Sequence, residues 1–190
     1  MESAKQYYND KPKDEMLDGK IYLMSLSPSI SHGRISMNLS RIFSNYLWKK
    51  PCDVFSEMDV HFSQKDRFKP DLTIVCNNDI VKKNGIFGAP DLIIEILSLS
   101  TASRDKGYKK NIYESSGVKE YWLVSAVERS VEVYLLKDGK YELDEIYVHV
   151  YDYELEEMTE EERALIITEL KTSIFDDLVI QVEDIFEGII

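Results

Sequence analysis

Glu95 lies in the middle of the apolar run of residues 90–97 (PDLIIEIL). A run of this kind is typical of a strand buried on both faces. A carboxylate in such a strand costs a large desolvation free energy unless a cation or several hydrogen-bond donors meet it. A second apolar run, residues 70–76 (PDLTIVC), carries Asp71, and residues 104–110 (RDKGYKK) are rich in lysine. Two acids in buried strands and a following basic segment predict a divalent-metal site with a cationic helper.

The two acidic strands can place their carboxylates side by side. If residues 69–76 and 90–97 pair antiparallel, the register that sets Asp71 opposite Glu95 is consistent along both strands. Directly opposed side chains begin ~5 Å apart, so the two carboxylates could share one Mg²⁺ with oxygen ligands at ~2.1 Å. The backbone carbonyl of Ile96 is a candidate third ligand. Without metal the acids would repel, and the pKa of one would rise.

Lys109 is the candidate catalytic cation. Lys109, Ile112 and Tyr113 share one helical face, with Asp105 one turn earlier. Because that face is partly apolar, we expect Lys109 to point inward or along a rim, where it would stabilise charge on a phosphate or orient a water. Asp105 and Tyr113 are candidate supporting residues, Tyr113 chiefly by packing. The alternative is a solvated lysine.

Four more side chains are candidate supporting residues. Asp91 shares the face of Glu95 but stands four residues away, roughly 13 Å along a strand, so we expect it to satisfy backbone donors at the start of that strand. His32 precedes the first helix and could bond its own loop, contact a phosphate or shuttle a proton. Glu57 and Asp59 share one face of an earlier strand and could add a metal ligand or form a solvated edge.

Hydrophobic periodicity predicts the elements that carry the first acid. After a loop at residues 26–31, one helical face is expected to be buried until Pro51 ends the helix; its members are Ile35, Leu39, Ile42, Phe43, Tyr46 and Leu47. Strands are predicted at residues 53–62, 69–76 and 90–97. The polar, glycine-containing residues 77–89 are predicted to form a loop.

The second half of the predicted core begins with another helix. Ser103 is expected to cap it, Asp105 to face its dipole in the first turn, and Gly117 to end it. A strand at residues 120–125 completes the order α, β, β, β, α, β.

Turns and caps predict the outlying elements. Asp18-Gly19 predicts an N-terminal hairpin, and residues 137–140 turn the strand 130–136 into the strand 141–147. Thr159 and Glu162 form a capping box at the start of a helix expected over residues 159–170. Late core contacts are expected from residues 178–180 and 185–186.

Length and composition predict one domain. With 190 residues, 44% of them hydrophobic, the chain can bury a sizeable core. We expect residues 1–190 to form a single domain, with a core at about 30–125 and a β-hairpin and acidic C-terminal extension over 126–190. No segment has the length of a transmembrane helix and no apolar secretory signal begins the sequence, so a cytoplasmic location is expected. Cys52 and Cys76 match no metal spacing and are expected to be reduced core residues.

The net charge of −12 is unevenly distributed. Residues 142–190 hold 16 acids and 2 bases, a net of −14, whereas residues 1–141 hold 19 acids and 21 bases, a net of +2. A solvated acidic surface that aids solubility is the preferred interpretation of the tail. A DNA-mimicking or partner-facing segment is the alternative.

The sequence resembles the PD-(D/E)xK nuclease superfamily, whose core has the order α-β-β-β-α-β. More closely, it resembles the bacterial Uma family (the "Uma-two" domain) of restriction-endonuclease-like proteins. The matching segments cover most of residues 20–145: MSLSP at 24–28 with His32, KPDL at 69–72, GAPDLIIEILS at 88–98 with its continuation through Arg104-Asp105 to Lys109, and GVKEYWLV at 117–124. The resemblance implies an α/β fold with a mixed central sheet, an extra N-terminal hairpin and a C-terminal β/α extension.

The resemblance also implies roles for individual residues. Asp71 corresponds to the first acid of the motif and Glu95 to the second. The superfamily's lysine would fall at Leu97, a departure from the general pattern; in the Uma branch the basic residue is expected from the following helix, at Lys109.

The implied activity is hydrolysis of DNA phosphodiester bonds by an Mg²⁺- or Mn²⁺-dependent endonuclease. A cluster of three basic residues would hold flanking phosphates without reading sequence, namely Arg104, Lys106 and Lys110. Because this cluster is small, a stable DNA complex is expected to need a homodimer, a partner protein or a loop that the sequence does not identify. The alternative from another class is an inactive module on the same fold that binds nucleic acid or protein, its acids being structural remnants. In a third interpretation, the strands and tail build an oligomer.

Overall fold

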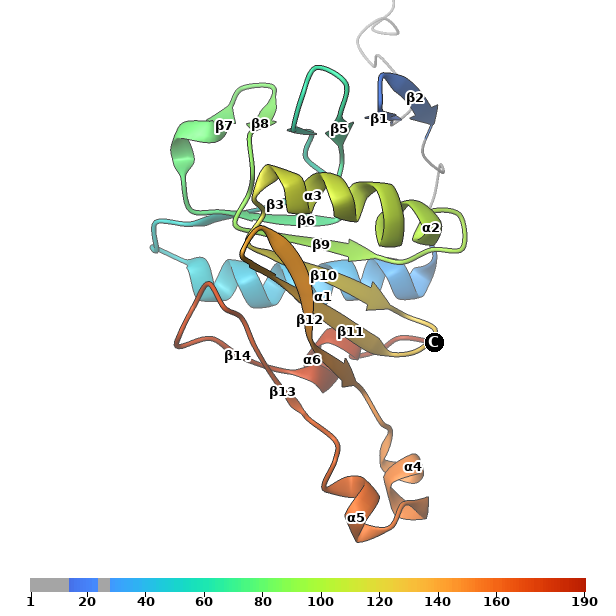
Figure 1. The fold of residues 1–190 in the computed structure, drawn as a ribbon. Helices are drawn as coiled ribbons and strands as arrows, with labels where there is room; N and C mark the ends of the chain where they lie inside the picture. Colours follow the sequence, from blue (N-terminus) through green and yellow to red (C-terminus); the bar gives the residue numbers. More distant parts are fainter. Residues whose placement is uncertain (1–13, 24–27) are drawn as a thin grey trace, which may run out of the picture.

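A mixed six-stranded sheet forms the centre of the computed structural model, which describes residues 14–23 and 28–190. Its order is β12-β11-β10-β9-β6-β3 (Figure 1). The bounds are β3 (Asp53–Ser56), β6 (Leu72–Val75), β9 (Leu92–Ile96), β10 (Glu120–Ser125), β11 (Ser130–Lys137) and β12 (Lys140–Val148). Only β9 and β10 pair parallel within this sheet, and the other neighbours pair antiparallel. The predicted mixed sheet and the core order are confirmed.

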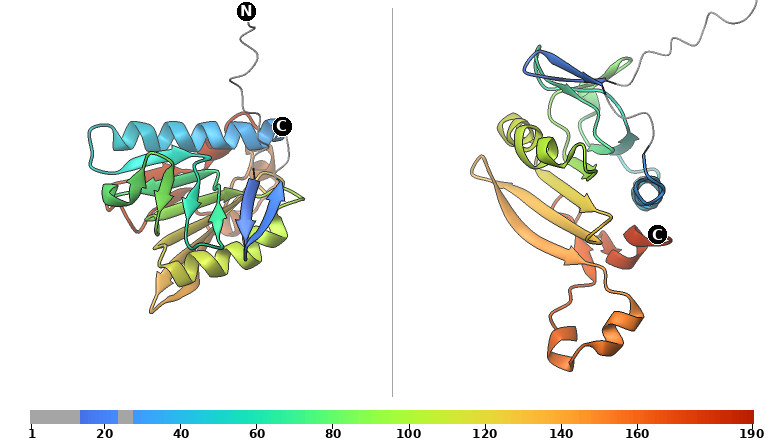
Figure 2. Two further views of the ribbon diagram at one scale, coloured as in Figure 1. Left: turned by 90° about the horizontal axis from the view of Figure 1, so that it is seen from above. Right: turned by 90° about the vertical axis from the view of Figure 1, so that its right-hand side faces the viewer.

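One face of this sheet is covered by α1 (Ile30–Leu47) (Figure 2). The Ser29 side chain accepts a hydrogen bond from the His32 N–H and caps the helix. The predicted inward stripe is confirmed: four of its residues are buried, Ile35, Leu39, Phe43 and Leu47. They pack with buried residues of β6, β9 and β10 in the largest hydrophobic cluster. Residues 26–27 of the predicted entry loop, and residues 24–27 of the MSLSP match, lie outside the described residues.

The opposite face is covered by a continuous helical segment made of α2 (Ala102–Arg104), a π-helical turn η2 (Asp105–Lys109) and α3 (Lys110–Ser116). Gly117 ends it with φ of 88°, as predicted. The predicted Ser103 cap is wrong, because Ser103 lies inside α2 and Thr101 precedes its first residue. The side chain of Asp105, expected in the first turn and one turn before Lys109, is buried and contacts Lys109.

A second six-stranded sheet packs beside this helical segment, in the order β2-β1-β5-β4-β8-β7 (Figure 2). Its strands are short: β1 (Asp14–Leu17), β2 (Lys20–Leu23), β4 (Val60–His61), β5 (Arg67–Phe68), β7 (Val81–Lys82) and β8 (Gly85–Phe87). The predicted hairpin at Asp18-Gly19 is confirmed, with φ of 46° and 75°.

Two sequence predictions are corrected by this second sheet. Residues 53–62 are divided, because β3 belongs to the central sheet while β4 belongs to the small one, whereas residues 69–76 contain the single strand β6 of the central sheet. Glu57, with φ of 50°, breaks the first of these runs just after β3. Residues 77–89, predicted as a loop, contain the 3₁₀ turn η1 (Asn78–Ile80), β7 and β8. Strands of two or three residues are too short to show an alternating pattern in sequence.

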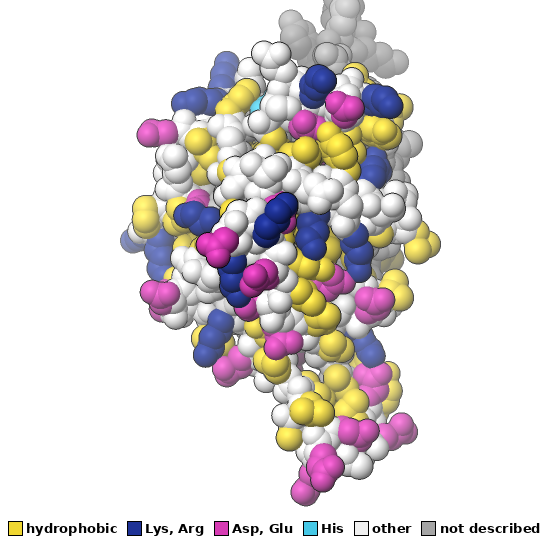
Figure 3. All heavy atoms as spheres, viewed as in Figure 1, with side chains coloured by type: hydrophobic (Ala, Val, Ile, Leu, Met, Phe, Trp, Pro, Cys, Tyr) yellow, Lys and Arg dark blue, Asp and Glu magenta, His cyan; other side chains and the backbone are white. Residues whose placement is uncertain are grey.

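The C-terminal extension contains α4 (Asp152–Glu157), α5 (Glu160–Arg163), β13 (Glu169–Lys171), β14 (Val179–Gln181) and α6 (Val182–Phe186). The capping box of Thr159 and Glu162 is confirmed. However, the helix ends at Arg163 and not at residue 170, since the following residues turn into β13. α4 and α5 project from the body, and acidic side chains gather on this projection (Figures 1 and 3).

The end of the chain returns to the core. Leu178, Ile180, Ile185 and Phe186 are buried as predicted, while Val179 is exposed. α6 packs on α1, where the Asn38 side chain donates to the Ile185 and Glu187 carbonyls. No described helix has the length and apolar character required to span a bilayer.

Cys52 and Cys76 form a disulfide in this structure, so the prediction of two reduced cysteines is corrected. The pairing of β3 with β6 sets Asp53 opposite Val75, and one further step sets the two cysteines opposite each other, with their Cα atoms 4.0 Å apart. Sequence inspection missed this contact because the bond depends on the register between β3 and β6.

Candidate functional site

The register of β6 and β9 brings the two predicted acids together. The strands pair antiparallel with Leu72 opposite Ile94, and the same register one residue further sets Asp71 opposite Glu95. The Ile96 N–H donates to Asp71 Oδ2 at 2.7 Å, so the backbone of Ile96 faces β6. The backbone N–H and C=O groups of successive residues in a strand point to opposite neighbours, so those of Glu95 point away from β6. Asp71 and Glu95 therefore form a non-hydrogen-bonded pair, in which the two opposed side chains share one face of the sheet and lie closest. The predicted register is confirmed at this end of the strands.

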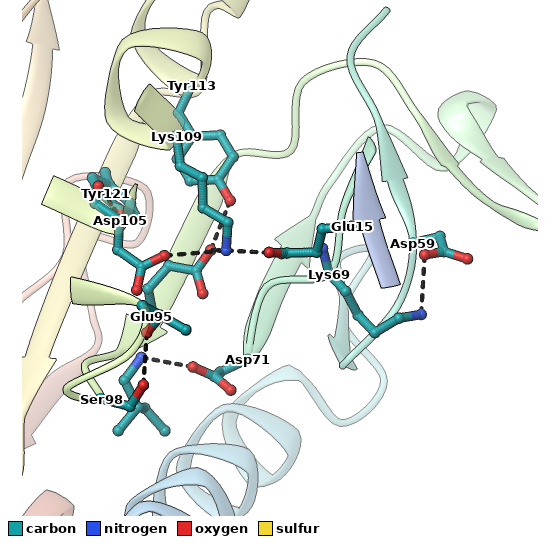
Figure 4. Close-up of polar contacts among 12 residues, drawn as sticks. Glu15, Asp59, Lys69, Asp71, Glu95, Ser98, Asp105, Lys109, Tyr113 and Tyr121 are labelled. Atoms are coloured by element: carbon teal, nitrogen blue, oxygen red, sulfur yellow. Dashed lines mark hydrogen bonds and ion pairs between the residues drawn. The ribbon is translucent and has the colours of Figure 1, made fainter. Parts of the chain in front are cut away.

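Lys109 lies at the centre of a buried ion cluster beside Glu95 (Figure 4). Its Nζ lies 2.8 Å from Glu15 Oε1, 2.9 Å from Glu95 Oε1 and 3.1 Å from Asp105 Oδ1. Glu95 is 4% exposed and Lys109 2% exposed. Of the two orientations expected for Lys109, inward or along a rim, the structure has the inward one, with the ammonium at Glu95.

The π-helical turn explains how one helix supplies both ends of an ion pair. Asp105 and Lys109 are the first and last residues of η2 and contact each other as an i, i+4 pair. π-Helical turns are rare and occur frequently at functional sites. The turn thus directs two charged side chains of one element at Glu95.

Burial and charge act against each other within this cluster. Burial favours a neutral amine, but Glu95, Asp105 and Glu15 outweigh it and raise the pKa of Lys109 above its ordinary value. Burial raises the pKa of Glu95 well above its ordinary value, although Lys109 opposes this, and the charges of Asp105, Asp71 and Glu15 add to the rise. Burial also raises the pKa of Asp105. The cluster therefore holds more negative charge than one ammonium offsets.

Two buried tyrosines support the cluster. The Tyr113 hydroxyl donates to Glu95 Oε1 at 2.7 Å, and the Tyr121 hydroxyl donates to the Asp105 carbonyl at 3.1 Å. Burial raises the pKa of both phenols, so they remain protonated donors at neutral pH. Tyr113 thus packs in the core, as expected, and also binds the second acid directly.

Asp71 lies at the solvent-facing edge of the site, between the strand and the start of α1. Its Oδ1 lies 3.2 Å from His32 Nε2, and its side chain is 15% exposed. Burial lowers the pKa of His32, but the hydrogen bond to Asp71 and the charges of Asp71 and Glu57 raise it above the ordinary value overall. A protonated His32 would stabilise the Asp71 carboxylate, a contact that the helix-entry position alone did not predict.

The remaining acidic candidates lie elsewhere. Asp91 accepts from the Cys76 N–H at 2.7 Å and from Lys119 Nζ at 2.7 Å, the backbone-satisfying contact that the sequence favoured. Asp59 Oδ1 pairs with Arg67 and Lys69 at 3.2 and 3.0 Å. Glu57 contributes to the negative field at His32.

The three predicted phosphate-binding residues are engaged within the protein. Arg104 lies over the Tyr22 ring at 5.4 Å. Lys106 pairs with Glu132 at 2.7 Å, and Lys110 lies 3.3 Å from the centre of the Tyr134 ring. Each contact would compete with a phosphate for the same cation.

Glu15 is the residue of the cluster that sequence inspection missed. It is buried on β1, and its Oε1 accepts from the Lys69 N–H at 3.0 Å as well as contacting Lys109. A signal was present: the Asp18-Gly19 turn indicates a hairpin, and Glu15 shares strand parity with the buried Leu17. That parity places an acid on the inward face of the hairpin.

Comparison with known proteins gives consistent matches. The family model described as "Uma2: Putative restriction endonuclease" matches residues 1–168. The "Uncharacterized protein slr1290" of Synechocystis sp. is 30% identical over 131 residues, covering 67% of this chain and 68% of that protein. A second Synechocystis protein, "Uncharacterized protein sll1609", is 28% identical over 127 residues, covering 64% of this chain and 71% of that protein.

A crystal structure from Anabaena variabilis, described as a "putative nuclease belonging to DUF820", has a similar fold. The TM-score is 0.64 at 20% identity, with 92% of this chain and 90% of that chain covered. At this level of identity the likeness shows the fold, which is the predicted restriction-endonuclease-like α/β fold.

Proposed function

Because the chain belongs to the Uma2 family, we propose that it is a metal-dependent endonuclease that hydrolyses DNA phosphodiester bonds. One observation carries the proposal: two acids from adjacent strands share a sheet face, and the buried Lys109 contacts the second of them at 2.9 Å. A nuclease site of this type requires oxygen ligands for a divalent ion and a cation near the reacting phosphate.

The donor set fits Mg²⁺ or Mn²⁺. Asp71 and Glu95 provide carboxylate oxygens, and the carbonyl of Ile96 lies on the same side of β9 as the N–H that meets Asp71. Mg²⁺ is typically bound by one or two carboxylates, with waters and substrate phosphates completing its shell. Across residues 14–23 and 28–190, no group of three or more His, Cys, Asp or Glu side chains is placed to hold a metal ion. The excess negative charge around Glu95 is a second reason to place a cation here.

Each residue of the proposed site has a separate task. When bound, the divalent ion would polarise the scissile phosphate and lower the pKa of a bound water. Asp71 and Glu95 would hold that ion, with His32 and Tyr113 fixing the orientation of the two carboxylates. Lys109 would hold the attacking water or offset charge developing on the phosphate oxygens. Asp105 would keep the ammonium aimed at Glu95.

The hairpin of β7 and β8 offers a better DNA contact than α2–α3 does. Lys82 and Lys83 make no ion pair with any described residue, in contrast to Lys106. Beside them, Phe87 is 45% exposed and stacks on His61 at 4.2 Å between ring centres. Unpaired lysines bind phosphates without reading sequence, and an exposed ring can pack on a sugar or base. DNA binding as a homodimer stays a prediction.

The burial of the cluster favours one alternative function. A lysine that is 2% exposed and contacts three carboxylates is also what a structural ion cluster would show. In that case the chain would be an inactive module on a nuclease fold, binding nucleic acid or protein.

Metal-dependent thermal melting separates the two functions. Mn²⁺ should raise the melting temperature of the parent, and both Asp71→Asn and Glu95→Gln should abolish this rise. Glu132→Gln is the matched control, since it removes one acid that pairs with a lysine outside the site. The parent and the control should also nick supercoiled plasmid in Mn²⁺, while the two site variants should not. Equal cleavage by all four proteins would indicate contamination, and no metal effect in the parent would favour the inactive module.

A further inference from the structure

The ammonium of Lys109 donates a hydrogen bond to Glu95 Oε1 and is enclosed by two further carboxylate oxygens. A lysine ammonium carries three N–H donors, and three carboxylate oxygens surround it at 2.8, 2.9 and 3.1 Å. The side chain is also closed to solvent. The proposed role of Lys109, holding a water or a phosphate oxygen, therefore requires one of the three acids to leave.

The three acids differ in how firmly the fold holds them. Glu95 lies on β9, which is paired on both sides by β6 and β10. Asp105 begins the same π-helical turn that ends at Lys109 and moves with it. Glu15 lies on β1, whose ladder contact beyond its own hairpin is the single pair of Met16 with Arg67. Glu15 is therefore the partner that can separate at the lowest cost.

The β1–β2 hairpin, residues 14–23, is fastened to the body mainly at its turn and its polar face. The Gly19 N–H donates to the Lys65 carbonyl and the Asp18 N–H donates to Asp66, while Asp14 pairs with Arg67. The strand β2 is exposed along its whole length. The buried Leu17 also packs in a cluster with Phe68 and Tyr113, so lifting β1 from Lys109 costs part of this packing and the hydrogen bond from the Lys69 N–H to Glu15, and leaves the strand pairing of the central sheet intact.

We propose that Glu15 is a positioning residue that occupies, on Lys109, the place of a substrate phosphate oxygen, and that the β1–β2 hairpin moves aside when a phosphodiester enters. The proposal rests on the proposed nuclease function. The exchange replaces one singly charged oxygen acceptor by another, so an anionic oxygen lies beside the Lys109 ammonium before and after. Access to Lys109 is thus controlled by competition between Glu15 and the anionic backbone of the substrate.

Chemical labelling of Lys109 tests this without requiring nuclease activity. The intact protein is treated with an amine-acetylating reagent, and modification at Lys109 is followed by mass spectrometry. The parent should be modified slowly at this position. Glu15→Ala should raise the rate roughly tenfold or more, which corresponds to about 1.4 kcal/mol in the opening equilibrium. Lys20→Ala is the matched control, since it removes a charge from the exposed strand β2 of the same hairpin and leaves Glu15 and the Asp14–Arg67 ion pair in place.

A second variant and a second measurement cover a folding defect in Glu15→Ala. Glu15→Gln keeps the oxygen acceptor and removes the charge, so its Lys109 should be modified faster than in the parent and more slowly than in Glu15→Ala. In the parent, backbone amides of residues 14–17 should exchange with deuterium faster than those of β9. Slow exchange in β1 equal to that of β9, or an unreactive Lys109 in folded Glu15→Ala, would overturn the proposal.

Plasmid cleavage distinguishes failure of this proposal from failure of the nuclease function. If Glu15→Ala exposes Lys109 and cleaves faster than the parent at low DNA concentration, both are supported. If Lys109 becomes reactive while neither protein cleaves, the positioning role of Glu15 stands and the nuclease function fails. If the parent cleaves and Lys109 stays unreactive in every Glu15 variant, the nuclease function stands and the positioning role fails.

Discussion

Replacing Lys109 by methionine should strongly destabilise the fold. Met preserves much of the side-chain volume but leaves three buried carboxylates without the cation they share. Removing one partner of a buried ion pair typically costs ~3–5 kcal/mol. For a protein of this size 1 kcal/mol shifts the melting temperature by about 2–4 °C, so a fall of roughly 6–20 °C is expected at pH 8.

The loss should also depend on pH in a defined direction. The raised pKa of Lys109 means that its contribution is fully present below its ordinary pKa of about 10.4 and disappears only above it. In the variant, the pKa values of Glu95 and Asp105 rise further above those of the unfolded chain. The folded state then binds more protons than the unfolded state, so stability increases as the pH falls. The deficit at pH 8 should accordingly shrink by pH 5.

Thermal melting in EDTA at pH 5 and pH 8 measures both effects. Lys110→Met is the matched control: the neighbouring lysine lies over the Tyr134 ring and should cost at most about 1 kcal/mol. A Lys109→Met protein within about 1 kcal/mol of the parent at pH 8 would refute the reasoning, and so would an equal deficit at both pH values.

Three further predictions concern other parts of the chain. Glu95→Gln should raise the metal-free melting temperature at pH 8, because burial raises the pKa of Glu95 and makes its ionised form costly to the fold; this gain should vanish as the pH approaches 4.5. A lower melting temperature at pH 8 would show that the ionised carboxylate is net stabilising. The double variant Lys82→Ala/Lys83→Ala should reduce the slope of log affinity for DNA against log salt concentration by ~1.8, since each phosphate that the protein no longer neutralises contributes ~0.9. An unchanged slope in a fluorescence anisotropy titration would show that this hairpin does not contact DNA. Reducing the disulfide between Cys52 and Cys76, which are 24 residues apart, should lower stability by ~3 kcal/mol, and identical melting with and without reductant would contradict the bond.

The central elements could be predicted because their signals are local. Apolar residues at helical spacing marked α1, and two apolar runs marked β6 and β9. The register of those strands was also predictable, since opposing Asp71 and Glu95 is the arrangement in which one ion can offset two buried charges. Short strands such as β4 and β5 had no such signal, because two residues cannot show a period.

The candidate site was predictable only in the part that adjacent elements build. Glu95 and Lys109 are joined by one strand-to-helix connection, so strand parity and helix face suffice to bring them together. Glu15 and His32 come from the N-terminal region, and their contacts with Lys109 and Asp71 depend on how the small sheet and α1 dock on the central sheet. Docking of this kind is determined by the packing of whole surfaces, which a linear pattern does not encode.

In the proposed function, charge balance would link the metal, Lys109 and the β1–β2 hairpin. Among the described residues, the carboxylates of Glu15, Glu95, Asp71 and Asp105 are in contact with two cationic partners, Lys109 and a protonated His32, which leaves a formal charge of about −2 when all acids are ionised. Burial raises the pKa of Glu95, and the neighbouring carboxylates raise it further. One divalent cation would neutralise this excess without any protonation. Exchanging Glu15 for a phosphodiester would then replace one negative charge by another. The charge balance would be kept while the acceptor beside Lys109 changes from a protein carboxylate to a substrate oxygen. Metal binding and hairpin opening are therefore complementary steps, because the first removes the excess charge and the second opens access to Lys109.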